Sequence, residues 1–167
     1  MASFAFYRPV HISKIISGGQ TGADRAALDW AIAHNIPHGG WCPKGRLAED
    51  GVIDAKYNLQ ETPKAEYIQR TEWNVRDSDA TAIFSIAPIL TGGSLATAEI
   101  AAAQRKPCLQ LSEAQSISEN ATDLRKFLKE HNVGKLNVAG PRASGEPEIG
   151  TLVTDIFGAA CEQAAND

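Results

Sequence analysis

The sequence has no excess of basic residues. Its 167 residues include 16 Lys and Arg against 20 Asp and Glu, which gives a formal net charge of -4 and a pI near 5.6. Proteins that bind nucleic acid or anionic membranes broadly need a basic face. The composition therefore argues against both kinds of partner, while a local basic pocket for a small anion stays compatible with it.

Cysteine is scarce and widely spaced. Cys42, Cys108 and Cys161 are odd in number and form no CxxC pair, which argues against a disulfide framework and a zinc knuckle. Reduced thiols favour a cytoplasmic location. The sequence also lacks a signal-peptide pattern near its start and any apolar run close to the ~18 residues of a membrane span.

Three fingerprints of nucleotide and hydrolase sites are missing. The sequence contains no GxGxxG, no GxxxxGK[ST] and no GxSxG, which weakens the dinucleotide, ATPase and serine-hydrolase interpretations. The histidines are scattered, and we predict no metal site. They are His11, His34, His38 and His131.

Short β-branched segments alternate with segments of helical periodicity. This alternation predicts an α/β fold, a mainly parallel sheet with helices on both faces. We expect a single domain over residues 1–167, with residues 1–12 as an N-terminal extension. The expected strands are 14–17, 36–43, 80–87, 107–112 and 135–140, and the expected helices are 23–34, 70–79, 95–105, 119–134 and one opened by Pro147. Expected helix limits are Asn35, Asn120 as an N-cap, and Gly134 as a stop.

Glycine-rich turns follow several predicted strands. In an open α/β sheet these turns meet at one edge, where ligands bind. Glycine lets an anion approach the backbone, and N–H groups at a helix start attract it. We therefore predict anion binding by two loops, although glycine in such turns also serves turning alone. The predicted residues are Gly18, Gly19, Gln20, Thr21 and Gly22 in the first loop, and Thr91, Gly92, Gly93 and Ser94 in the second.

Basic residues on the same rim would add charge to this site. We predict contributions from Lys44, Arg46 and Arg142, with Gly45 in the same turn as Lys44 and with Arg25 one turn into the first helix. The segment 44–71 is long for a connection, which fits either a functional loop or a surface excursion.

Glu99 follows the second loop on an Ala-rich helix. Its carboxylate is placed to act as a general base or to bind a ribose hydroxyl, or it is an ordinary exposed residue. Among the aromatic residues, Trp41 is the better candidate to stack on a ligand ring, because Trp73 has helical spacing and suits the core. The Ala-rich helices and the Ile156–Phe157 stripe suit either the core or a subunit interface.

Five segments carry a resemblance to a known family: SGGQTGADRAALDWA, GWCPKGRLAEDGVI, RTEWNVRDSDATAIF, TGGSLATAEIA and LNVAGPR. They resemble the family of molybdenum (molybdenum-cofactor) carrier proteins, the circularly permuted YpsA-like branch of the SLOG superfamily. The resemblance runs from about Lys14 to Phe157. It implies a Rossmann-like domain and suggests a homo-oligomer.

The superfamily includes nucleotide binders and enzymes that cleave nucleoside monophosphates with a PGGxGTxxE loop. Thr91, Gly92, Gly93 and Glu99 stand where that loop has Pro, Gly, Gly and Glu, whereas its later Gly and Thr are not matched. The resemblance implies binding of a phosphate-bearing small ligand, either a nucleotide or molybdenum cofactor. The alternatives are a nucleotide N-glycosidase that uses Glu99, with Arg46 on the phosphate, and a nucleotide-sensing signalling module.

Overall fold

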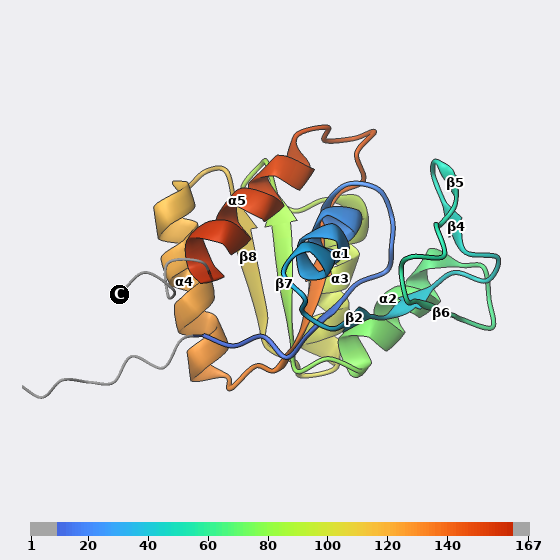
Figure 1. Cartoon of the computed structure of the whole chain (residues 1–167), viewed down its shortest axis with the longest axis horizontal. Helices are drawn as coiled ribbons and strands as arrows, with labels where there is room; N and C mark the ends of the chain where they lie inside the picture. Colours follow the sequence, from blue (N-terminus) through green and yellow to red (C-terminus); the bar gives the residue numbers. More distant parts are fainter. Residues whose placement is uncertain (1–9, 162–167) are drawn as a thin grey trace, which may run out of the picture.

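A parallel sheet of five strands forms the centre of the molecule (Figure 1). The structure is a computed structural model and describes residues 10–161. The strand order is β2-β1-β9-β7-β8, with every neighbouring pair parallel. The strands are β1 (Lys14–Ile16), β2 (His38–Gly39), β7 (Ala80–Ser85), β8 (Cys108–Ser112) and β9 (Lys135–Ala139). The expected parallel sheet is confirmed, and its last strand lies between β1 and β7.

Helices cover both faces of the sheet, as predicted. On one face α5 packs between α1 and α4, and on the other α2 packs against α3 (Figure 1). The helices are α1 (Ala23–Ala33), α2 (Tyr67–Arg76), α3 (Gly92–Ala103), α4 (Ile117–Glu130) and α5 (Ile149–Cys161). This arrangement is Rossmann-like.

The core lies between the sheet and its helices. All six residues of β7 are buried, as expected for a strand covered on both faces. The Phe84 ring of β7 lies 5.5 Å from the Phe157 ring of α5, measured between centroids. Ile156 and Phe157 are fully buried, so the stripe that they form belongs to the core of this domain.

The start of α4 differs from the predicted one. Ser116 is the N-cap, and its side chain accepts a hydrogen bond from the Glu119 backbone N–H at 3.1 Å. The Glu119 carboxylate accepts in return from the Ser116 N–H at 2.9 Å, which completes a capping box. Asn120 is not the cap, because its side chain is buried and donates to the Ser112 carbonyl at 2.8 Å.

Asparagine, rather than glycine, provides the left-handed residue after two helices. Asn35 follows α1 with φ of 53°, which confirms the predicted limit there, and Asn132 follows α4 with φ of 49°. The predicted stop at Gly134 is wrong because α4 already ends at Glu130. Asparagine tolerates this conformation better than most side chains.

The segment between β2 and α2, residues 40–66, forms an excursion outside the main sheet. It contains a parallel pair, β3 (Trp41–Cys42) with β6 (Gln60–Glu61), and an antiparallel pair, β4 (Leu47–Ala48) with β5 (Gly51–Val52). Ile53, Tyr57 and Leu59 anchor it in the hydrophobic core. The long predicted connection is therefore ordered.

The predicted N-terminal extension, residues 1–12, falls mostly outside the described range. Ile12 is described and is buried in the core. Between residues 10 and 161, no helix has both the length and the apolar character needed to cross a membrane.

Asp79 joins the start of β7 to the start of β9. Its hydrogen bonds predict that the free energy of unfolding depends on pH. Its Oδ2 accepts from the backbone N–H groups of Lys135 at 2.7 Å and Gly134 at 2.9 Å. These bonds, the one from Lys135 above all, lower the pKa of Asp79. A carboxylate with a lowered folded-state pKa stabilises the fold above its unfolded pKa and loses this effect as the pH falls through the folded pKa.

We expect Asp79→Asn to lower the free energy of unfolding by about 1 kcal/mol at neutral pH, and by clearly less once the pH is well below the unfolded pKa of about 3.9. Urea unfolding at both pH values measures this. The exposed Asp155→Asn is the matched control and should have little effect at either pH. An equal loss for Asp79→Asn at both values would contradict the assigned role of the charge.

Candidate functional site

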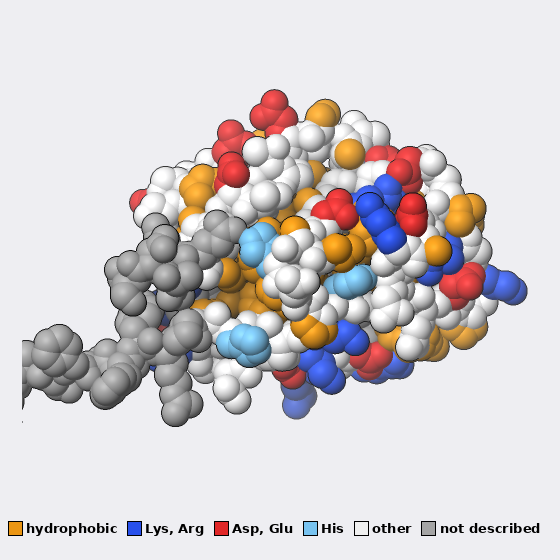
Figure 2. Space-filling view, viewed as in Figure 1, with side chains coloured by type: hydrophobic (Ala, Val, Ile, Leu, Met, Phe, Trp, Pro, Cys, Tyr) orange, Lys and Arg blue, Asp and Glu red, His pale blue; other side chains and the backbone are white. Residues whose placement is uncertain are grey.

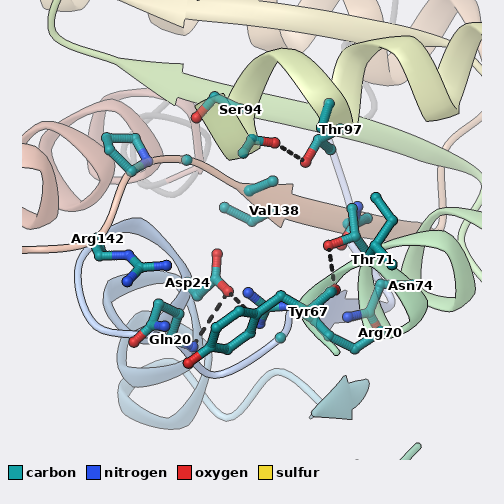
Figure 3. Close-up of a pocket in the computed structure, with 18 of the residues that line it drawn as sticks. Gln20, Asp24, Tyr67, Arg70, Thr71, Asn74, Ser94, Thr97, Val138 and Arg142 are labelled. Atoms are coloured by element: carbon teal, nitrogen blue, oxygen red, sulfur yellow. Dashed lines mark hydrogen bonds and ion pairs between the residues drawn. The ribbon is translucent and has the colours of Figure 1, made fainter. Parts of the chain in front are cut away.

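A cavity of about 310 Å³ lies at the carboxyl ends of β1 and β9, between α2 and the start of α3 (Figure 3). This is the edge where open parallel sheets bind ligands. Its volume is at the small end of the range for ligand sites. The predicted residues that line it are Gly18, Gln20, Thr91, Gly93, Ser94 and Arg142.

The α3 side of the cavity is an open helix N-terminus. Thr91 is the N-cap, and no side chain in the described part of the chain caps this helix. A Cβ added to Gly92 or Gly93 would meet nothing within 4 Å, so the space before the first turn is free. Backbone N–H groups here and the helix dipole favour an anion.

The β1–α1 loop, in contrast, is filled by the protein itself. A Cβ on Gly19 would lie 2.5 Å from Leu59 Cδ1, and one on Gly22 would lie 2.4 Å from the Pro141 carbonyl oxygen. These two glycines therefore allow close packing of neighbouring loops. The Asp24 carboxylate accepts from the Gln20 backbone N–H at 3.3 Å. Asp24 thus supplies a negative charge at the start of α1, where an external anion was predicted.

The side chain of Arg70 in α2 packs against this loop. Its Nη1 donates to Asp24 Oδ2 at 3.3 Å, and both side chains are largely buried. Burial raises the pKa of Asp24, and Arg70 and the Gln20 N–H oppose this. A Cβ on Gly18 would lie only 1.9 Å from Arg70 Nη1. Gly18 therefore makes room for the guanidinium.

Arg70 retains unused hydrogen-bonding capacity. Its Nε is buried and has no partner among the described residues. A guanidinium has five N–H donors, and a buried donor without an acceptor costs free energy.

Tyr67 brings an aromatic ring to the cavity between two cations. The Cζ atoms of Arg70 and Arg142 lie 5.4 and 5.6 Å from its ring centroid. Figure 3 shows Tyr67, Arg142, Gln20 and Asp24 on one side of the cavity and Ser94 and Thr97 of α3 on the other. The residue is 39% exposed and lines the cavity.

Polar side chains form the inner wall. Asn137 of β9 donates to Thr81 Oγ1 of β7 at 3.1 Å, and Asn74 of α2 bonds the Trp41 backbone at both its N–H and its carbonyl. Gln20 accepts from Thr21 N–H at 3.0 Å, while its Nε2 is buried without a partner among residues 10–161. The wall is therefore rich in amides and hydroxyls.

Glu49 joins the excursion to two loops at this edge. Its carboxylate accepts from the hydroxyls of Thr21 and Ser144 and from the Ser144 backbone N–H at 3.1 Å. These donors, Ser144 first, lower the pKa of Glu49. Arg142 Nε lies 4.0 Å from Glu49 Oε2. The predicted Thr21 is thus committed to holding loops together.

Other predicted cations do not line the cavity. Arg25 pairs with Asp50 and donates to the Gly19 carbonyl at 3.0 Å. Arg46 donates to four backbone carbonyls of the excursion, those of Ile53, Asp54, Tyr57 and Leu59, at 2.8 to 3.1 Å. Lys44 and Gly45 lie beside it in the excursion, and the Gly45 N–H donates to Glu61 at 2.6 Å. Arg46 therefore supports the excursion.

Glu99 and Trp41 also lie outside the cavity lining. Glu99 is exposed on α3. Trp41 donates from its indole Nε1 to Asp77 at 2.7 Å and makes an edge contact with Trp73. The aromatic side chain that reaches the cavity is Tyr67.

Sequence reasoning missed Asp24, Tyr67, Arg70 and Asn74. All but Asp24 belong to α2, which the sequence predicted as a helix from residue 70 but did not connect with the site. An acidic residue directly after the glycine loop was an available signal, because a first-turn carboxylate competes with a ligand for the same N–H groups.

Comparison with known proteins places this geometry in a family. The model of the circularly permuted YpsA SLOG family matches residues 15–161. A crystal structure of a "Putative molybdenum carrier protein" from Syntrophus aciditrophicus SB is 51% identical, with a TM-score of 0.88, covering 91% of this chain and 96% of that one. No curated protein matches the chain.

The close contact of Gly18 with Arg70 predicts that a methyl group at position 18 destabilises the fold. We expect Gly18→Ala to displace Arg70 from Asp24 and to lower the free energy of unfolding by about 1–3 kcal/mol, measured by urea unfolding. Gly93→Ala is the matched control, since its Cβ meets open space, and it should be neutral or slightly stabilising. Equal effects of the two substitutions would contradict the packing of Arg70 on Gly18.

Proposed function

Because the chain belongs to the circularly permuted YpsA SLOG family, we propose that its cavity binds a phosphate-bearing small molecule, either a nucleotide or molybdenum cofactor. The observation that carries this proposal is the pairing of an open α3 N-terminus with two arginines across one cavity. A helix N-terminus and guanidinium groups both bind phosphate oxygens well.

In this proposal the phosphate lies at the first turn of α3. Thr91, Gly92, Gly93 and Ser94 offer backbone N–H groups and hydroxyls there, as predicted from the sequence. Arg142 supplies charge from the opposite wall, and its side chain is about half exposed, so it is free to turn toward a ligand. The β1–α1 loop shapes the cavity and already contains the Asp24 carboxylate.

The ring of the ligand would lie against Tyr67. A planar heterocycle stacks well on tyrosine, and the amides of Gln20 and Asn137, which also line the cavity, suit its polar edge. A nucleobase and a pterin both meet these requirements.

The name of the Syntrophus protein mentions a molybdenum carrier, which favours a cargo that contains molybdenum, and molybdenum cofactor is such a cargo. Within residues 10–161, no group of three His, Cys, Asp or Glu side chains could hold a metal ion directly. The residues present fit the phosphate and the pterin ring of such a cargo. Under this proposal the metal would be carried by the pterin.

The proposal is binding without turnover. Glu99, the residue assigned to the glycosidase alternative, is exposed and does not line the cavity.

A homo-oligomer and a cytoplasmic location remain predictions. Of the 12 residues of α3 only Thr97 and Ala101 are buried, and Leu95 is 42% exposed, which favours a subunit contact.

Native mass spectrometry of the gently purified protein, followed by a denaturing run, would identify a bound ligand. Calorimetric titration with AMP, ribose 5-phosphate and a pterin phosphate would then test the site. We expect Arg142→Gln to weaken binding by roughly tenfold or more, since one charged contact is worth at least 1.4 kcal/mol. Lys44→Gln is the matched control and should bind as the unchanged protein does.

Glu99→Ala separates binding from catalysis. We expect it to retain binding, and we expect no release of base or ribose phosphate by either protein. A protein that is isolated empty and gains no thermal stability from any of these compounds would count against the phosphate site. Base release that disappears in Glu99→Ala would support the glycosidase instead.

A further inference from the structure

A second hollow lies at the opposite edge of the sheet, at the amino ends of β1 and β9 and beside the end of α2. Its volume is about 520 Å³. Figure 2 shows Lys and Arg side chains gathered along the lower edge of the molecule, the edge at which β7 begins in Figure 1. The charged residues that line the hollow are Lys14, Arg76, Asp77, Asp79, Lys106 and Lys135.

The two carboxylates of this hollow already have several donors. Asp77 accepts from Arg76 Nε at 2.8 Å and from the Trp41 indole N–H at 2.7 Å. Asp79 accepts from two backbone N–H groups, those of Gly134 and Lys135. Neither carboxylate forms an ion pair with a lysine ammonium among the described residues.

Two of the four cations are also committed. Arg76 pairs with Asp77 and lies over the Trp73 ring at 4.6 Å. Lys106 Nζ donates to the carbonyls of Arg76 at 3.1 Å and Ser78 at 2.7 Å. It thereby binds the carbonyl-rich end of α2, a usual place for a cation.

The other two cations of the hollow are Lys14 and Lys135. They are register partners on the parallel strands β1 and β9, so their side chains leave the same face of the sheet as direct neighbours. Neither ammonium has a hydrogen bond or ion pair within residues 10–161. The Lys14 ammonium lies beside Gly39 of β2, and the charge of Lys135 helps to lower the pKa of Asp79. Both ammonium groups therefore keep donors for a ligand in the hollow.

The backbone shapes the space for Lys14. A Cβ on Gly39 of β2 would lie 2.9 Å from Lys14 Cε and 3.1 Å from its Nζ. The lysine stem therefore lies across a position that a larger residue would fill. Trp41, held by its bond to Asp77, and the exposed Gln60 complete the adjoining wall.

We propose that this hollow is a second binding site, for a small oxyanion of the phosphate or carboxylate type, bound by the ammonium groups of Lys14 and Lys135 that line it. The Gln60 amide is available as a further donor. The site is separate from the cavity at the carboxyl edge and does not depend on the function proposed for it. Lysine suits this role as a compact point charge with three donors.

The test is an NMR titration with sodium phosphate against sodium chloride at constant ionic strength, because general screening must stay fixed. The reporters are the backbone amides of Lys14 and Lys135 and the Trp41 indole N–H. We expect saturable shifts in the unchanged protein and an affinity reduced by roughly tenfold or more in Lys14→Gln/Lys135→Gln. Lys129→Gln, on the exposed face of α4, is the matched control and should keep the affinity.

Two further variants keep the outcome decisive. Arg142→Gln should leave these shifts unchanged, since it changes only the carboxyl-edge cavity. Lys14→Gln alone replaces the double variant if thermal unfolding shows that the double variant is not folded. Shifts that do not saturate, that persist in the lysine variants, or that disappear in Arg142→Gln would overturn the proposal.

Discussion

The contact of the Asp24 carboxylate with the β1–α1 loop and with Arg70 organises the carboxyl edge of this protein. The carboxylate satisfies the Gln20 N–H at the start of α1 and holds the guanidinium that arrives from α2. Burial opposes the charge on Asp24. The hydrogen bonds from these donors therefore stabilise the charged carboxylate, and the carboxylate satisfies the donors. The absence of a side chain at Gly18 makes room for the guanidinium, so Arg70 of α2 reaches Asp24 of α1.

The excursion of residues 40–66 gives this edge its second support. Arg46 stabilises the excursion from within by binding four of its carbonyl groups. Glu49 then joins it to the loops after β1 and β9. Residues that look like ligand-binding cations in the sequence thus hold the walls in place, and the open positions are left to α3, Arg142 and Tyr67.

The sequence predicts the strands and helices well because burial leaves a local pattern. Four of the six residues of β7 are apolar, and α5 repeats its apolar residues at helical spacing. The glycine-rich turns of the sequence, which follow the strands, predict the edge of the sheet at which the cavity lies. The sequence does not show that Asp24 fills the first loop, that Arg25 pairs with Asp50, which lies 25 positions away, or that Arg46 binds backbone carbonyls of the excursion. Nor does periodicity reveal that Tyr67 and Arg70 face the cavity, which depends on how α2 packs.

The position of β9 has a consequence for the order of assembly. β1 and β7 do not pair with each other, and β9 joins them. During synthesis from the N-terminus, β1 and β2 cannot join β7 and β8 in one sheet until residues 135–139 have emerged. The loop with Arg142, the end of β9 and the wall containing Asn137 arrive together at that step. The cavity therefore forms late in synthesis, in the same step in which β9 completes the sheet.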